Sequence, residues 1–197
     1  MSLYPSADFL TSAAQSSQFP EDSGAEVAFA GRSNSGKSSA INAILGRRGL
    51  ARSSKTPGRT RLLNCFQLVP GRRIVDLPGY GYAAASAAEK ATWAPMIDAL
   101  AQRQCLRGLF VVIDSRRGVM EGDWGLLEWA ESARLPVHVL LSKSDKLKRA
   151  EAREALKAAK AALSVRAGVH LFSVEDGTGI DEARAKMDEW LAQTVVA

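Results

Sequence analysis

An eight-residue segment constrains the fold of this chain more than any other part of its sequence. The segment is GRSNSGKS, Gly31–Ser38, and it satisfies the pattern GxxxxGKS/T at every fixed position. It follows the apolar run EVAFA and leads into SSAINAIL, whose apolar spacing is typical of a helix. Glycines let the backbone curl around phosphate, while the amide groups and the helix start offer it positive partial charge. This context predicts a phosphate-binding loop rather than a glycine turn that only caps a helix.

Each position of this loop has a predicted role in holding a nucleotide. Lys37 is expected to reach the β- and γ-phosphate oxygens, and Ser38 to bind Mg²⁺ through its hydroxyl. The residues predicted to surround the phosphates are Gly31, Arg32, Ser33, Asn34, Ser35, Gly36, Lys37 and Ser38. The sequence therefore predicts a bound nucleotide with Mg²⁺.

A second turn, DLPG at Asp76–Gly79, ends the apolar run RRIVDL one strand pair after the phosphate loop. A carboxylate at this point can hold Mg²⁺ through water, and the Gly79 amide can face the γ-phosphate. Alone, this tetrapeptide is usually only a turn. Its place after the phosphate loop favours a role in holding Mg²⁺ and contacting the γ-phosphate. The residues assigned to this element are Asp76, Leu77, Pro78 and Gly79.

The segment SKSD follows the apolar strand PVHVLL and is predicted to select the base. Ligands of open α/β sheets bind at the carboxyl ends of the strands. A carboxylate at Asp145 can accept hydrogen bonds from N1 and the exocyclic amine of guanine, whereas adenine lacks this pair of donors. Lys143 is expected to lay its stem along the base, and a later, less specific strand end to offer amides to the guanine oxygen. These residues are Ser142, Lys143, Ser144, Asp145, Phe172, Ser173 and Val174.

From Glu26 onward, short apolar runs alternate with helical patterns, and this order predicts an α/β fold. Strands are expected at 26–30, 62–69, 72–77, 108–114, 136–142 and 168–173, with helices at about 37–46, 86–104, 123–134, 149–163 and 179–192. The tight Pro70-Gly71 connection predicts one antiparallel pair, because parallel strands need a longer crossover. The expected architecture is three-layer α/β/α around a six-stranded, mostly parallel sheet with one antiparallel edge strand.

The length of 197 residues suits one such domain, at 25–197, preceded by a loosely held arm at 1–24 that is rich in Ser and Ala. No apolar run approaches the roughly 18 residues that cross a bilayer, and the first ten residues lack the features of a secretory signal. We therefore expect a cytoplasmic protein with no membrane span. Cys65 and Cys105 have no metal-binding or redox spacing, which predicts buried free thiols.

Four segments, FAGRSNSGKSS, TPGRT, DLPGYGYA and SKSDK, closely resemble in order and spacing the EngB/YihA/YsxC family of bacterial TRAFAC-class GTPases. The resemblance covers nearly everything from Glu26 to Leu191. It implies a Ras-like P-loop GTPase fold and the binding of GTP or GDP with Mg²⁺. It also implies a role in assembling the large ribosomal subunit and a need for the protein in normal cell division and septation.

By the same resemblance, TPGRT is a switch segment in which Thr60 binds Mg²⁺ when GTP is present. Thr56 is the rival ligand, since both hydroxyls lie in a loop with glycine and proline. The nucleotide-contacting residues of this segment are then Gly58, Arg59, Thr60, Arg61 and Leu62. Lys37, Thr60 and Gly79 are expected to act on the γ-phosphate during hydrolysis, with Ser38 and Thr60 as the metal ligands.

Three positions bear on the rate and strength of nucleotide use. Tyr80 stands where many GTPases carry a water-orienting glutamine, so intrinsic hydrolysis is expected to be slow. Ser142 stands where an asparagine is usual, which predicts a modest affinity for guanine. Asn34 resembles the residue that binds K⁺ in cation-activated relatives, so K⁺ is a candidate second cofactor.

Basic residues are concentrated near the predicted switch. Between 47 and 73 there is no Asp or Glu, and the eight basic residues are Arg47, Arg48, Arg52, Lys55, Arg59, Arg61, Arg72 and Arg73. A second stripe, Arg149, Arg153, Lys157 and Lys160, recurs at near-helical spacing. Folded ribosomal RNA or a precursor of the large ribosomal subunit is the expected partner, against the simpler interpretation of solvated basic surfaces.

Two candidate functions follow from these patterns together with the family resemblance. The first is a slow GTPase that acts as an assembly switch, and we expect it to be a monomer. The second is a nucleotide-gated module that binds RNA or ribosomes and hydrolyses GTP negligibly without its partner. A P-loop kinase is disfavoured because SKSD follows a strand and points to guanine specificity.

Overall fold

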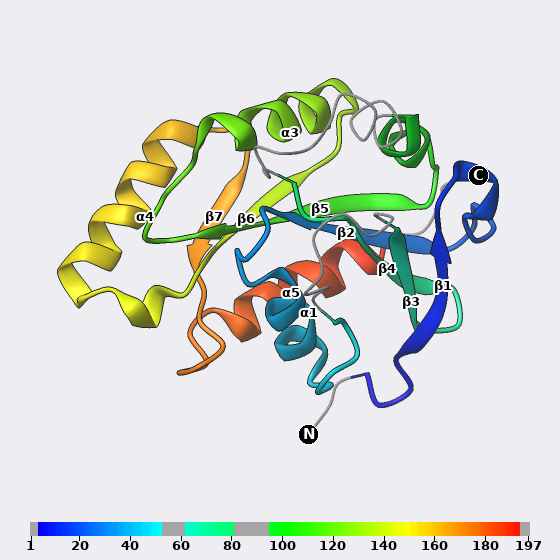
Figure 1. The fold of residues 1–197 in the computed structure, drawn as a ribbon, viewed down its shortest axis with the longest axis horizontal. Helices are drawn as coiled ribbons and strands as arrows, with labels where there is room; N and C mark the ends of the chain where they lie inside the picture. The colour runs from blue at the N-terminus through cyan, green and yellow to red at the C-terminus, as the bar shows by residue number, and fades with distance from the viewer. Residues whose placement is uncertain (1–3, 53–61, 81–94, 194–197) are drawn as a thin grey trace.

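A seven-stranded sheet in the order β1-β3-β4-β2-β5-β6-β7 forms the centre of the fold (Figure 1). The structure is a computed structural model that describes residues 4–52, 62–80 and 95–193. The strands are β1 (Asp8–Ala13), β2 (Ala25–Gly31), β3 (Leu63–Val69), β4 (Arg72–Asp76), β5 (Leu106–Asp114), β6 (Val137–Ser142) and β7 (Gly168–Leu171). From β4 to β7 every pairing is parallel, whereas β3 is antiparallel to both of its neighbours. The predicted mostly parallel sheet is confirmed.

Helices cover both faces of the sheet, which confirms the three-layer α/β/α architecture (Figure 1). One face is covered by α1 (Lys37–Leu45) and α5 (Ile180–Leu191), and the other by α3 (Glu121–Ser132), α4 (Arg149–Leu163) and the helical residues 95–101. Two short 3-10 helices are η1 (Ser16–Gln18) and η2 (Ser144–Lys146). The first part of the helix expected at 86–104 lies outside the described residues.

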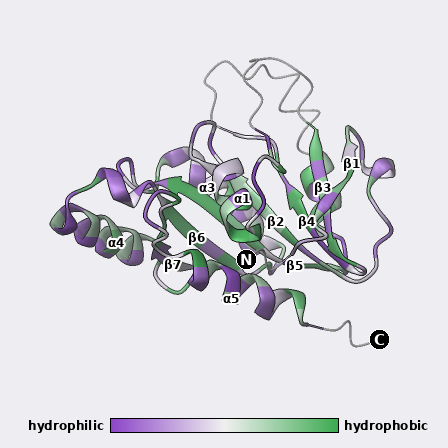
Figure 2. Ribbon diagram, turned by 90° about the horizontal axis from the view of Figure 1, so that it is seen from below, coloured by the Kyte–Doolittle hydropathy of each residue, from purple (hydrophilic) through white to green (hydrophobic). Residues whose placement is uncertain are grey.

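The side chains of strand β2 show how the sequence produces the three layers. Ala28 and Ala30 belong to the core on the α3 side, while Val27 and Phe29 belong to the core on the α1 and α5 side. Side chains alternate across a strand, so a central strand covered by helices must be apolar at every position. Figure 2 shows this contrast, with the central strands largely hydrophobic and hydrophilic segments on the outlying helices.

The seventh strand, β1, lies in the N-terminal segment 1–24 that was expected to be a loosely held arm. Strand β1 pairs antiparallel with β3, so β3, the antiparallel strand, is second from the edge. Its first residues are exposed, and only Ala13 at its end is buried. Backbone pairing with β3, a hydrogen bond between the Ser12 and Asn64 side chains and the edge contact of Phe9 with Phe66 hold β1 in place. The strand has no alternating apolar pattern, and this explains why six strands were expected instead of seven.

Two further expectations concern the described part of the chain. Within those residues, no helix is both long and apolar enough to span a bilayer. Cys65 and Cys105 are both buried and free, as predicted. Burial is the main cause that raises the pKa of the Cys65 thiol to about 11, so this thiol is not a reactive thiolate at neutral pH.

Candidate nucleotide-binding site

The predicted phosphate loop connects the end of β2 to the start of α1. Gly36 is the residue before the helix and has a φ of 94°, a conformation that glycine adopts without strain. Asn34 also has a positive φ, of 65°. Helix α1 begins at Lys37, so the backbone amides of its first turn lie at the end of the loop, where a helix N-terminus attracts anions.

Lys37 and Asp76 meet at the carboxyl edge of the sheet. Strands β2 and β4 are parallel neighbours, so the phosphate loop and the DLPG turn leave the sheet on the same side. The ammonium of Lys37 contacts the Asp76 carboxylate, and both side chains are almost completely buried. Burial raises the pKa of Asp76, while the charge and hydrogen bond of Lys37 oppose that shift. The two elements predicted to serve the phosphate and the metal thus come together.

The donor atoms at this point suit Mg²⁺. The site offers the Ser38 hydroxyl in the first turn of α1 and the carboxylate of Asp76 at the end of β4. Hard oxygen atoms from hydroxyl, carboxylate and water are the ligands that Mg²⁺ prefers. Both Thr60 and its rival Thr56 lie outside the described residues, so the choice between them stays a prediction.

The DLPG turn packs directly on the phosphate loop. The Tyr80 amide lies 3.3 Å from the Gly31 oxygen, and the Ser33 amide donates to the Tyr80 oxygen at 3.0 Å. A Cβ atom on Gly79 would lie 2.9 Å from the Ser33 hydroxyl and 3.4 Å from the Ser33 Cα and amide nitrogen, so the Ser33 side chain would have to rotate away. Gly79 therefore lies directly against the phosphate loop.

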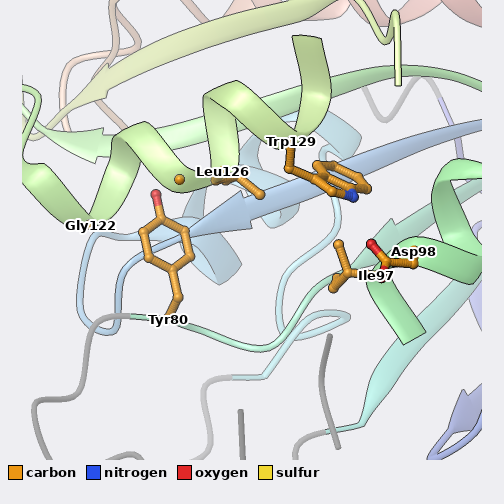
Figure 3. Close-up of a pocket in the computed structure, with 7 residues that line it drawn as sticks. Tyr80, Ile97, Asp98, Gly122, Leu126 and Trp129 are labelled. Carbon is orange, nitrogen blue, oxygen red and sulfur yellow. The ribbon is translucent and has the colours of Figure 1, made fainter. Parts of the chain in front are cut away.

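The side chain of Tyr80 is directed toward α3 (Figure 3). Its hydroxyl donates to the Asp123 carboxylate at 2.8 Å, and the other oxygen of this fully buried carboxylate accepts the Met120 amide, also at 2.8 Å. Burial first, and then Asp123, raises the pKa of Tyr80. The tyrosine lines a pocket of about 250 Å³ whose other walls include Ile97, Asp98, Gly122, Gly125, Leu126 and Trp129. Neutral and bonded to α3, it does not resemble a water-orienting side chain.

The segment SKSD reaches back to the phosphate loop. The Ser142 hydroxyl lies 2.5 Å from the Ser35 carbonyl oxygen and is fully buried within the fold. The Lys143 ammonium donates to the Asn34 carbonyl oxygen at 2.6 Å. The segment predicted to select the base and the loop predicted to bind phosphate, about a hundred residues apart in sequence, are thereby joined by hydrogen bonds.

Asp145, the residue predicted to recognise guanine, is oriented by Ser173. The Ser173 hydroxyl donates to Asp145 Oδ1 at 2.8 Å, and Lys146 Nζ lies 2.9 Å from Oδ2. These contacts, with Lys146 the larger cause, lower the pKa of Asp145, so the carboxylate is charged at neutral pH. The Ser173 amide, expected from sequence to be available for guanine, donates to the Thr178 oxygen at 2.9 Å.

The neighbours of Ser173 differ in their environment. Phe172 is buried and its carbonyl oxygen accepts the Ser144 amide at 3.2 Å, which joins the two turns. Val174 is 44% exposed.

The nucleotide-contacting residues predicted near the switch fall mostly outside the described part of the chain. Leu62 is half-buried just before β3, whereas Gly58, Arg59, Thr60 and Arg61 lie outside it.

Asp114, which was not among the residues predicted from sequence, lies beside the SKSD segment. It ends β5 opposite Ser142, and its carboxylate contacts Lys143 at 3.0 Å and Arg116 at 2.7 Å. The hydrogen bond from Arg116 is the largest cause that holds the pKa of Asp114 far below its usual range. The sequence did contain a signal for Asp114, because it is an acidic residue at the end of the apolar run GLFVVID. The carboxyl ends of strands in such a sheet are where ligands bind.

The fold and the two ends of this site are those of a P-loop GTPase, and residues 26–143 match the family described as 50S ribosome-binding GTPase. A relative from Nitrosococcus oceani, named probable GTP-binding protein EngB, is 53% identical over 194 residues, which cover 96% of this chain and 97% of the relative. A relative of the same name from Coxiella burnetii is 47% identical over 193 residues, 96% of this chain and 94% of its own. The chain belongs to the EngB family of GTP-binding proteins.

Solved structures agree with this fold. A crystal structure of a probable GTP-binding protein EngB has a TM-score of 0.65 at 22% identity and covers 85% of this chain and 98% of its own. Era in complex with MgGDPNP and nucleotides of 16S ribosomal RNA has a TM-score of 0.64 at 21% identity, covering 89% of this chain and 59% of its own. At these identities the likeness shows the fold alone.

Proposed function

We propose that this protein binds GTP with Mg²⁺, hydrolyses it slowly, and uses the change from GTP to GDP as a switch in assembly of the large ribosomal subunit. The observation that carries the proposal is the contact of Lys143 with the phosphate loop, beside the pair of Lys37 and Asp76. One nucleotide can therefore span the site, with its phosphates at Lys37 and its base at Asp145. The domain proposed to do this extends from residue 25 to residue 197.

The roles of the chain's own residues follow from the chemistry of phosphate transfer. Lys37 would place its positive charge on the β- and γ-phosphate oxygens, and the Gly79 amide would donate to the γ-phosphate. Ser38 and Thr60 would hold Mg²⁺, with Asp76 bound through water. Bound Mg²⁺ supplies neutralising charge to the phosphate oxygens. With Tyr80 bonded to Asp123, the attacking water would be positioned by backbone groups and by a partner, which supports slow intrinsic turnover.

A second candidate is a nucleotide-gated RNA or ribosome-binding module with negligible hydrolysis. The bond from Tyr80 to Asp123 favours it, because the residue after the DLPG turn is engaged with α3. We regard the switch GTPase as the better proposal, since Lys37, Gly79 and the base-recognition residues are all present. We further propose that the protein acts in the cytoplasm as a monomer and is needed for normal cell division and septation.

Phosphate release from GTP distinguishes the two candidates. The full chain alone should release phosphate slowly, and large-subunit precursor particles should raise the rate at least about tenfold by completing the water-positioning groups. The same assay in KCl and in NaCl tests Asn34, since a K⁺ ion bound there would make the rate higher in KCl. No basal turnover and no stimulation would favour the binding module and contradict the switch.

Not all basic residues of the cluster between 47 and 73 are free to contact ribosomal RNA. Arg73 is buried and forms a 2.8 Å ion pair with Glu26, so it is not available to RNA. Arg47 is half-buried and donates to the Pro5 carbonyl oxygen. Arg48, Arg52 and Arg72 are exposed, and of these Arg48 and Arg52 lie nearest in sequence to the predicted switch, so we propose them for the phosphate contacts.

Reversing the charge of Arg48 and Arg52 to glutamate should weaken binding to large-subunit particles. Each lost phosphate contact should lower the slope of log affinity against log salt by about 1, so the slope should fall by about 2. The matched control is Arg134→Glu with Arg166→Glu, which changes the net charge equally at two exposed positions outside both basic clusters. Sedimentation with particles measures binding, and fluorescent GDP checks that the nucleotide site is intact. Equal effects of the two pairs would reject a specific surface near the switch.

A further inference from the structure

Both histidines of the chain lie together, far in sequence from the phosphate loop. The protein has two histidines, and they occupy the neighbouring parallel strands β6 and β7 as His138 and His170. Both are buried, at 8% and 5% exposure, and His138 Nε2 lies 2.7 Å from His170 Nδ1. The carboxylate of Glu182, in the first turn of α5, lies 3.3 Å from His170 Nδ1. Three potential ligand atoms from three elements thus lie within 4.8 Å of one another.

The hydrogen bond on the far side of the His170 ring determines its tautomer. His170 Nε2 lies 3.1 Å from the Gly179 carbonyl oxygen. A carbonyl oxygen only accepts, so Nε2 carries the proton, and in the neutral ring Nδ1 has a free lone pair. Histidines that bind metals commonly donate their second ring N–H to a backbone carbonyl in this way. His170 is therefore oriented as a metal-binding histidine would be.

Burial favours the neutral form of both rings. It is the main cause that lowers the pKa of His138 to about 4, and it also lowers the pKa of His170, although Glu182 and the hydrogen bond to Gly179 oppose that shift. The neutral imidazole is the form that binds metals. With His170 neutral, its Nδ1 lone pair faces the negatively charged oxygen of Glu182 at 3.3 Å, and the ring offers no proton to that oxygen. A cation between them would bind both groups.

We propose that His138 Nε2, His170 Nδ1 and Glu182 form a binding site for a divalent transition-metal ion, with Zn²⁺ the best match. Two imidazoles and a carboxylate are a donor set that zinc prefers, and water would complete the tetrahedron. The side chain of Glu182 is 62% exposed, so the ion has access from that side. Zn–N bonds of about 2.0–2.1 Å place two ring nitrogens about 3.3 Å apart, so the 2.7 Å contact must open by roughly 0.6 Å. His138 would carry its remaining proton on Nδ1.

An ion at this point would connect β6, β7 and α5 close in sequence to the turn that holds Ser173. His170 lies three residues before Ser173, and the Gly179 oxygen that it contacts ends the loop in which the Ser173 amide bonds Thr178. The site is separate from the phosphate loop and does not depend on how fast GTP is hydrolysed. Its role would be to brace the loop that holds Ser173 against Asp145.

The ring nitrogens of the two histidines give a direct test. Full-length protein without an affinity tag, labelled with ¹⁵N and saturated with GDP and Mg²⁺, is titrated with zinc chloride while the four ring nitrogens are followed by NMR. We expect one zinc per chain, with His138 Nε2 and His170 Nδ1 shifting together and His170 Nε2 remaining protonated. If zinc leaves all four signals unchanged, the histidines form a hydrogen-bonded pair only and the proposal is wrong.

A matched pair of surface variants tests the third ligand. Glu182→Gln should weaken zinc binding by at least the roughly 10–100-fold that loss of an outer-shell partner costs. Asp181→Asn, a neighbouring and 94% exposed residue in the same helical turn, should leave it unchanged. Both positions are exposed, so neither variant should impair folding, and zinc affinity is measured by competition with a chelating dye. Equal affinities of the two variants would remove Glu182 from the site and overturn the three-ligand proposal.

Discussion

Replacing Asp145 with asparagine should raise the Kd for GDP about 100-fold and improve the binding of XDP. Asparagine keeps one acceptor but turns an amide donor toward the donors of guanine. The lost charge-assisted bond and the unsatisfied donor together cost about 3 kcal/mol, which is roughly a 100-fold change in Kd. Xanthine carries an oxygen where guanine carries its amine, so the new amide would gain a partner there. Competition against a fluorescent guanine nucleotide measures both affinities.

Asp176→Asn is the matched control for this experiment. Asp176 accepts the Thr178 amide at 3.0 Å in the same turn that positions Ser173, and it is exposed. The same change of charge at this position should leave GDP binding within about a factor of three, as expected for an exposed group outside the contact. An Asp145→Asn protein that binds GDP as well as the control would exclude the assigned role in base recognition.

Replacing Lys37 with alanine should both weaken GTP binding and destabilise the protein. Charge-assisted hydrogen bonds contribute about 1.5–3 kcal/mol each, so losing two phosphate contacts should cost at least about 100-fold in affinity. The same change leaves the buried Asp76 carboxylate without its cation. Breaking a buried ion pair on one side costs about 3–5 kcal/mol, although protonation of the carboxyl would reduce this.

A second substitution separates the two effects of Lys37→Ala. Adding Asp76→Asn removes the uncompensated charge, so the double variant should recover most of the lost free energy of unfolding. Denaturant unfolding of the nucleotide-free proteins measures that recovery, and fluorescent nucleotide binding of folded samples measures the affinity. A double variant as unstable as the single one would show that the lost stability does not come from the Asp76 charge.

The phosphate loop could be predicted because its constraints act on neighbouring residues. A left-handed backbone at Gly36, a helix starting at Lys37 and an apolar strand before them all appear within a short stretch of sequence. The DLPG and SKSD segments were recognised for the same reason, since each follows an apolar strand. Their order along the chain then indicated one site on one edge of the sheet.

Other features depend on which strands become neighbours, and a single sequence does not state this. Asp114 meets Lys143 because β5 lies beside β6, and Tyr80 meets Asp123 because the DLPG turn lies beneath α3. The role of the Ser173 hydroxyl was missed because its partner Asp145 is 28 residues away. Strand β1 was missed because its exposed residues carry no regular alternation of apolar and polar side chains.

The two outermost strands of the sheet have a consequence for how copies of this domain behave at high concentration. Strand β1 has six residues with an irregular register between Phe9 and Thr11, and β7 on the opposite side has only four. A growing intermolecular sheet needs a long, straight row of free amide and carbonyl groups, and a bulge interrupts such a row. Neither edge strand has a long, regular row of free backbone groups to which a strand of another molecule could pair. We therefore expect the fold to resist polymerisation through its sheet.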